Sequence, residues 1–238
     1  MKRPKVITFD IGHTLVFPLH DEFICLAEKH FGRTFSAVQV KEADCLLRYT
    51  NDDGIAKALR DLPLPSVTTF YSGGLICRLL PKCLDDMSIL LYFLKACEPT
   101  QDSWFTHLIK DAVPCLETLR NKGFRLGVIS NANGKVRRNL VATGVDKYFE
   151  FVADSGRVGF EKPDPRIFQH VYALAGIQPD ELLHIGDSVS SDVHGALNAG
   201  SQAALYDPDY RVPFGILPPH VPHFRSLPDF AASFCPAD

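Results

Sequence analysis

The sequence has few features of proteins that are held together by disulfide bonds or structural metals. Its seven cysteines are an odd number, and no two of them form a Cys-x-x-Cys pair. Most lie within apolar stretches, where a free thiol behaves as a small hydrophobic side chain. The pattern therefore predicts neither a disulfide framework nor a zinc site. The seven are Cys25, Cys45, Cys77, Cys83, Cys97, Cys115 and Cys235.

Long apolar runs and charge clusters of one sign are also missing. The first apolar run ends at Asp10, whereas a signal peptide needs roughly 7–15 apolar residues and a membrane span roughly 20. The 25 basic and 28 acidic residues give a net charge of −3. Partners such as nucleic acid or an anionic membrane usually require a concentrated basic surface. We therefore expect a cytoplasmic protein that binds neither.

What is present is the pattern of an α/β protein with an insertion. A short apolar run at 5–10 is followed by a block of helical periodicity, 17–109, without a convincing strand. Strands then alternate with helices that end at glycines, a pattern that requires parallel pairing and right-handed crossovers. We predict a doubly wound, Rossmann-like parallel sheet from 1–16 plus 112–238, and an inserted helical domain at 17–111. The later strands are expected at 124–130, 148–153, 182–186 and 202–206, and the helices between them at 115–121, 135–143, 166–175 and 192–199.

Polar residues follow the predicted strands. In an open parallel sheet, ligands bind beyond the carboxyl ends of the strands, so these residues would converge on one crevice. A carboxylate there can attack phosphorus and form an aspartyl phosphate. Two further carboxylates suit Mg²⁺, and a lysine ammonium offsets the charge of a transferring phosphoryl group. The residues are Asp10, Ser130 with Asn131, Lys162, Asp187 and Asp192.

Four segments at these positions resemble, in order, the motifs of the haloacid dehalogenase superfamily. They are FDIGHTL at 9–15, VISNAN at 128–133, EKPDPRIF at 161–168 and HIGDSVSSDVHGALNAG at 184–200. Each motif alone is modest, but all four in order on predicted strand ends are specific. The resemblance covers the α/β core, and the inserted helical block lies where the family places its C1-type cap.

The resemblance implies a hydrolase that uses Mg²⁺ and acts on a small phosphorylated molecule. It implies that Asp10 is the nucleophile, with Ser130 and Lys162 holding the phosphoryl group and its charge. It further implies that Thr14 and Asn131 contact the substrate. The metal ligands it implies are Asp10, the backbone carbonyl of Gly12, Asp187 and Asp192, the last of these either directly or from the second shell.

The first motif departs from the phosphatases of this family at one position. They carry a second carboxylate two residues after the nucleophile, which protonates the leaving alcohol and then activates water. Here that position is Gly12, and general acid–base groups contribute about 10²–10⁴ in rate. His13, adjacent to it, titrates near neutral pH and is a candidate substitute, although a partly exposed loop histidine is the favoured interpretation.

Three interpretations therefore remain open at the level of sequence. The protein is a slow phosphatase suited to good leaving groups, it cleaves C–P or C–halogen bonds, or it retains phosphate and metal binding without turnover. The metal-binding motif around Asp187 disfavours C–halogen cleavage, because dehalogenases of the family use no metal. We favour the phosphatase. Substrate identity, oligomeric state and protein partners are not predicted.

Overall fold

The chain forms two compact units in the computed structural model, which describes residues 2–49, 53–60, 62, 69–99, 104–209, 212 and 215–234. One unit comprises Met1–Phe17 and His107–Asp238, and the other comprises Pro18–Thr106. Each has its own cluster of buried apolar side chains, as separate domains do. The domain limits expected from the sequence, 1–16 with 112–238 and 17–111, stay a prediction.

The first unit is built on a six-stranded sheet in which every neighbouring pair is parallel. Its order is β5-β4-β1-β6-β7-β8. The central strands are buried along their whole length, as expected for a parallel sheet covered on both faces. The predicted fold class is confirmed. The strands are β1 (Val6–Phe9), β4 (Arg125–Ser130), β5 (Phe151–Asp154), β6 (Leu182–Gly186), β7 (Gln202–Tyr206) and β8 (His223–Phe224).

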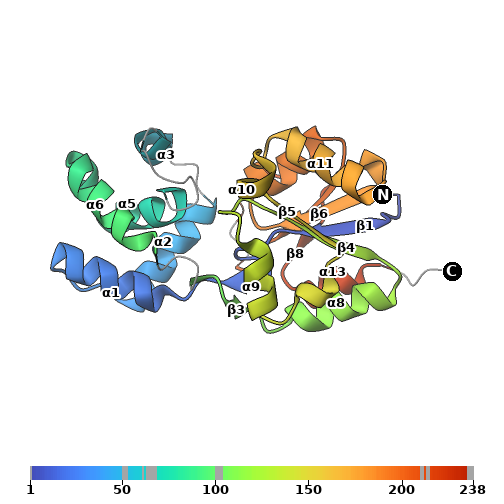
Figure 1. Cartoon of the computed structure of the whole chain (residues 1–238), viewed down its shortest axis with the longest axis horizontal. Helices are drawn as coiled ribbons and strands as arrows, with labels where there is room; N and C mark the ends of the chain where they lie inside the picture. The colour runs from blue at the N-terminus through green and yellow to red at the C-terminus, as the bar shows by residue number, and fades with distance from the viewer. Residues whose placement is uncertain are drawn as a thin grey trace. The chain divides into compact units, whose positions relative to one another are not determined.

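Helices cover both faces of this sheet. Figure 1 shows α11 (Pro165–Ala175) over one face, and α8 (Ala112–Asn121) with α13 (Leu227–Ala232) over the other. Helix α11 is capped at its start by Asp164, whose side chain accepts from the Arg166 amide, and at its end by Gly176 in the left-handed conformation. The remaining helices of this unit are α9 (Val136–Ala142), η3 (Asp146–Tyr148), α10 (Ser155–Val158), η4 (Pro179–Glu181), η5 (Val189–His194) and α12 (Gly195–Asn198).

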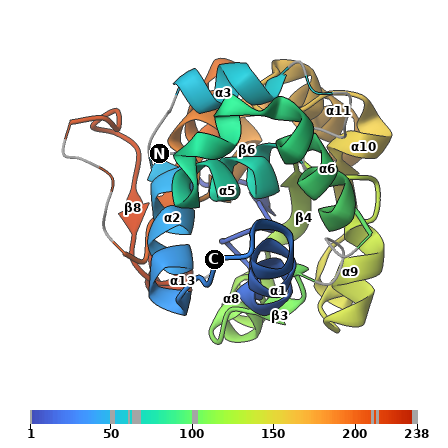
Figure 2. The same cartoon turned by 90° about the vertical axis from the view of Figure 1, so that its left-hand side faces the viewer.

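The second unit is helical in its described residues (Figure 2). Its core centres on Phe23, whose ring meets those of Phe93 and Trp104 edge to face at centroid distances of 5.8 Å. None of the described helices, in either unit, has the length and apolarity needed to cross a membrane. The helices are α1 (His20–Phe31), α2 (Ala37–Tyr49), α3 (Asp53–Arg60), η1 (Thr69–Gly73), α5 (Gly74–Leu79), η2 (Pro81–Asp85) and α6 (Met87–Cys97).

The expectation that 17–109 contains no strand is wrong at its two ends. Strands β2 (Val16–Phe17) and β3 (His107–Leu108) pair antiparallel, with Val16 opposite Leu108. The Ile109 amide also donates to the Leu15 carbonyl at 2.9 Å. Two-residue strands are too short to show alternating hydrophobicity, and their pairing joins segments far apart in the sequence, so no local pattern reveals them.

The buried thiols provide a test of the two cores. Cys25 is exposed, whereas Cys97 and Cys115 are buried, and burial raises the pKa of each of these two thiols to about 12. Because the thiolate is the reactive form, both should resist iodoacetamide at pH 8 while Cys25 reacts. Peptide mass spectrometry of the native and urea-unfolded protein measures this. Rapid labelling of Cys97 in the native protein would contradict the packing of the helical unit. Rapid labelling of Cys115 would contradict the packing of the α/β unit.

Candidate active site

Three of the predicted site residues lie at the carboxyl ends of neighbouring strands. Asp10 follows β1, Ser130 ends β4 and Asp187 follows β6. Strand β1 lies between β4 and β6 in the sheet, so the three positions are brought to one edge, where open α/β sheets bind ligands. No other described residue hydrogen-bonds the buried Ser130 hydroxyl. That hydroxyl is therefore available to a ligand.

Lys162 connects this edge to the helix that follows β6. Its ammonium donates to Asp10 Oδ1 and to Asp192 Oδ1, both at 2.6 Å, and to the Ile129 carbonyl at 2.9 Å. The lysine is only 4% exposed. Although burial opposes its charge, the two carboxylates raise the pKa of Lys162 above its usual value. The ammonium is therefore a fixed positive charge beside the predicted nucleophile.

Asp192 lies in a helical turn that differs from the predicted one. A helix was expected from 192, but the chain begins a π-helix at Val189 that runs to His194, a rare form often found at functional sites. A Cβ on Gly186 would lie 2.2 Å from Asp192 Cγ. Glycine at that position therefore allows the carboxylate to pack against the end of β6.

The side chain of Asn131 contacts the backbone of Lys162. Its Nδ2 donates to the Lys162 carbonyl at 2.9 Å, and its Oδ1 accepts from the Lys162 amide at 2.7 Å. This reciprocal pair holds the loop that carries the ammonium. Substrate contact by Asn131 stays a prediction, and the contacts that the structure does contain give this residue a positioning role.

The loop after β1 is tightly folded around Gly12. The His13 amide donates to the Val16 carbonyl at 2.7 Å, and Gly12 forms an isolated bridge with Val16. His13 has a φ of 56°, in the left-handed region that non-glycine residues rarely adopt. Its side chain is buried, rather than partly exposed as expected, and its ring packs edge to face on Phe17. Among the described residues, none hydrogen-bonds the buried hydroxyl of Thr14. Substrate contact by Thr14 also stays a prediction.

The carboxylates fit a divalent cation. Carboxylate oxygens of Asp10, Asp187 and Asp192 lie within 4.8 Å of one another, and all three residues are buried. Oxygen is the ligand that Mg²⁺ prefers. Three carboxylates around one ammonium leave the cluster negative, so a cation would offset charge that burial makes costly. The residues present therefore suit Mg²⁺, with the Gly12 carbonyl as a further predicted ligand.

The two carboxylates that share Lys162 have pKa values shifted in opposite directions. The pKa of Asp10 is raised, chiefly by burial and also by the neighbouring Asp192 carboxylate, although the Lys162 ammonium opposes this shift. Burial acts in the same sense on Asp192, but Lys162 and His184 together hold the pKa of Asp192 below its usual range. Asp192 is thus the more firmly ionised partner of the lysine.

His184 and Thr8 were not expected to belong to this site. His184, a buried residue of β6, contacts Asp192 Oδ1 through Nε2 at 3.1 Å and Thr8 Oγ1 through Nδ1 at 3.0 Å. One signal was available in the sequence. Polar residues inside the apolar runs of two adjacent buried strands must find a partner, since burying an unpaired polar group is costly.

Comparisons with known proteins identify the family to which the chain belongs. The family model of haloacid dehalogenase-like hydrolases matches residues 4–200. The bovine (Bos taurus) haloacid dehalogenase-like hydrolase domain-containing protein 3 is 36% identical over 217 residues, which cover 84% of this chain and 81% of that protein. The chain therefore belongs to the haloacid dehalogenase-like hydrolase family, and its relatives include proteins named as phosphatases.

Two further matches define how far the similarity extends. A glyceraldehyde 3-phosphate phosphatase of Methanothermobacter thermautotrophicus is 41% identical over 88 residues, but these cover only 37% of this chain and 39% of that protein. The crystal structure of the protein described as the putative HAD-hydrolase YfnB from Bacillus subtilis, bound to magnesium, matches with a TM-score of 0.70 at 17% identity, over 98% of this chain and 99% of that one. At this identity the structural match supports the fold alone.

Proposed function

We propose that the protein is a Mg²⁺-dependent phosphatase that hydrolyses a small phosphorylated molecule through an aspartyl phosphate on Asp10. The observation that carries the proposal is the buried Lys162 ammonium, 2.6 Å from both Asp10 and Asp192 at the carboxyl edge of the sheet. A fixed positive charge next to a carboxylate nucleophile suits phosphoryl transfer, in which charge stabilisation is the main catalytic requirement. Relatives named as phosphatases support the same reaction class.

In this reaction a carboxylate oxygen of Asp10 bonds to phosphorus while the bond to the leaving oxygen breaks. Water then attacks phosphorus and releases inorganic phosphate, restoring the Asp10 carboxylate. Lys162 and the Ser130 hydroxyl would hold non-bridging phosphoryl oxygens. Bound Mg²⁺, on Asp10 and Asp187 with the Gly12 carbonyl, would add positive charge at the same place.

The leaving group must depart without a carboxylic acid at position 12. Since Gly12 has no side chain, the leaving oxygen takes its proton from solvent, and departure is easiest when its conjugate acid is strong. Acyl and aryl phosphates meet this condition, and simple alkyl phosphates do not. We propose that the helical unit, Pro18–Thr106, acts as the cap that selects among such substrates.

Turnover of p-nitrophenyl phosphate and acetyl phosphate, with Mg²⁺ and with excess EDTA, tests the proposal. Activity should require Mg²⁺ and should fall by at least about 10³-fold in Asp10→Asn, because this change removes the attacking oxygen. Thermal melting of the variant shows that folding is retained. An Asp10→Asn protein as active as the parent would refute the assignment of the nucleophile.

The alternative is a protein that binds phosphate and Mg²⁺ without turnover, and Gly12 is the observation that favours it. Calorimetric titration with Mg²⁺ and with inorganic phosphate, compared with the hydrolysis assay, distinguishes the two functions. Binding together with no hydrolysis of either substrate would establish the alternative.

A further inference from the structure

Two cysteine side chains of the helical unit contact each other. Cys77 lies in α5 and Cys83 in η2, and their Sγ atoms are 3.5 Å apart. Both belong to the buried core of that unit, and the two residues are 1% and 7% exposed. Neither takes part in the proposed reaction, so the contact between the two thiols calls for an explanation of its own.

The chain turns sharply between the two thiols. Helix α5 ends at Leu79, and Leu80 leaves the helical conformation before Pro81 begins the five-residue 3₁₀ helix η2. The Cys83 amide donates to the Leu80 carbonyl at 2.9 Å. One tight turn therefore joins the segments that carry the two sulfurs.

The contact is close enough for a disulfide to form with little movement. A disulfide bond is about 2.05 Å long, so the two sulfurs, 3.5 Å apart, need to approach by roughly 1.5 Å. The side chains of Pro81, Lys82 and Asp85, on either side of Cys83, are exposed. Because core packing does not hold exposed side chains in place, the short segment can make this shift.

Cys83 differs in its ionisation from two other buried thiols. The contact with Cys77 lowers the pKa of Cys83, although burial and the Asp85 carboxylate oppose the shift. By contrast, burial raises the pKa of Cys97 and of Cys115 to about 12. Since the thiolate is the form that reacts with an oxidant, Cys83 is the more reactive of these buried thiols.

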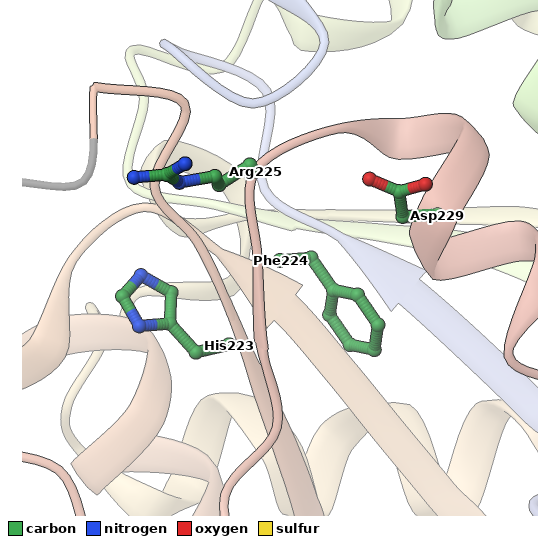
Figure 3. A pocket seen from close by; sticks show the side chains of 4 residues that line it. All are labelled: His223, Phe224, Arg225 and Asp229. Carbon is green, nitrogen blue, oxygen red and sulfur yellow. The ribbon is translucent and has the colours of Figure 1, made fainter.

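The described part of the α/β unit offers no comparable pair. Its one described cysteine, Cys115, lies in α8. The open groove beside β8, with a volume of about 460 Å³, has no sulfur among its lining side chains, which are those of His223, Phe224, Arg225 and Asp229 (Figure 3). Cys115 therefore serves as a control thiol from a separate core.

We propose that Cys77 and Cys83 form a redox-active dithiol, which hydrogen peroxide oxidises to a reversible disulfide. The Cys83 thiolate attacks one peroxide oxygen, the O–O bond breaks, and the other oxygen leaves as water, which gives a sulfenic acid on Cys83. The Cys77 thiolate then attacks the Cys83 sulfur, the S–O bond breaks, and a second water leaves. The two thiols lose two electrons and two protons, and the peroxide is reduced to two molecules of water.

A single reversible disulfide is compatible with a sequence that predicts no disulfide framework. In reducing compartments the disulfides that do form are usually transient and redox-sensing. Oxidation would fix the turn at Leu80 by linking α5 to η2. Thiol oxidation goes beyond the proposed phosphatase reaction and does not depend on it, so either can fail while the other stands.

Peptide mapping of the full-length protein tests the proposal without any substitution. The native protein is treated with hydrogen peroxide, free thiols are blocked with iodoacetamide after unfolding, and trypsin is added without a reductant. Trypsin cleaves after Arg78 and Lys82, between the two cysteines, so a disulfide joins peptides 61–78 and 83–95. This linked pair should be the main disulfide product in mass spectrometry, and dithiothreitol should separate it.

The other cysteines are internal controls for this experiment. The exposed Cys25 shows that the dose of peroxide was sufficient, and Cys115 shows that the fold was intact during the treatment. Complete alkylation of Cys77 and Cys83 at a dose that oxidises Cys25 would overturn the proposal, because the pair would then be two core thiols in contact. A link that forms only during oxidation in urea would also overturn it, since the folded contact would not be its cause.

Cys77→Ser and Cys83→Ser are a matched pair that tests the order of the steps. Each keeps a hydroxyl donor at the contact but removes one sulfur, and thermal melting shows whether both variants stay folded. In Cys77→Ser the sulfenic acid on Cys83 has no resolving thiol, so it should persist and react with dimedone. In Cys83→Ser, the more deeply buried Cys77 should take up at least about tenfold less dimedone. Equal uptake, or more at Cys77, would contradict Cys83 as the attacking thiol.

Discussion

Replacing Lys162 with methionine is expected to destabilise the metal-free protein by about 3–5 kcal/mol, the range for breaking a buried ion pair. The ammonium lies between two buried carboxylates, and methionine keeps most of the side-chain volume while removing the charge. Asp10 and Asp192, which are both buried, would then lack their shared counter-ion. Urea unfolding in EDTA measures the loss, and Mg²⁺ should partly restore stability, since a cation would again offset the carboxylates.

Lys2→Met is a matched control for this prediction. Lys2 also forms an ion pair, with Asp180 at 2.8 Å, but both side chains are 58% exposed. Exposed pairs contribute little because solvent screens them, so the urea midpoint of this variant should equal that of the parent. A Lys162→Met protein as stable as Lys2→Met would mean that the site is solvated and that its charges are not coupled as the contacts indicate.

The strands that carry the site were predictable because they are buried on both faces. Continuous apolar runs ending at a glycine or a polar residue gave β6 and β7 with the limits the structure has. Once the runs that form β1, β4 and β6 are paired in parallel, one edge of the sheet must carry Asp10, Ser130 and Asp187. That step needs the strand ends, which are local features of the sequence, and one rule of topology, that ligands bind beyond the carboxyl ends of parallel strands.

The parts that could not be predicted depend on contacts between distant segments. The pair β2 and β3 is defined by Val16 meeting Leu108, and β8 by pairing with β7. The π-helix that contains Asp192 adds one residue to a turn, which hydrophobic periodicity does not resolve. Likewise, no spacing rule shows that His184 reaches Asp192, because the contact joins a strand to the helix after it.

The resemblance to known motifs does not say which neighbouring groups each residue contacts. It implies that Asn131 contacts the substrate and that Asp192 binds the metal directly or from the second shell, and both stay predictions. The structure adds that Asn131 holds the Lys162 backbone and that Asp192 accepts a hydrogen bond from the Lys162 ammonium. A motif records residue types in order along the chain. Whether a carboxylate faces a cation or a neighbouring lysine depends on packing, such as that between Gly186 and Asp192.

Installing the missing carboxylate should produce the largest gain in activity. Gly12→Asp is expected to raise kcat/KM toward a simple alkyl phosphate by about 10²–10⁴-fold, the usual contribution of a general acid–base group. Gly12 is not among the glycines with positive φ, so an L-residue fits its backbone without the strain that a left-handed conformation would impose. The gain arises because a poor leaving group needs a proton as its bond to phosphorus breaks.

The same reasoning predicts how the gain depends on substrate. An aryl phosphate loses a stable phenolate, so Gly12→Asp should raise its turnover much less than that of glycerol phosphate. Gly12→Asn is the matched control, because asparagine is nearly the same size as aspartate but has no ionisable group that could donate a proton to the leaving oxygen. A gain shared by both variants would point to a change in loop conformation, and equal gains on both substrates would argue against acid catalysis. If neither variant hydrolyses either substrate while Mg²⁺ still binds, the scaffold lacks more than one carboxylate, and the binding role becomes the better explanation of this site.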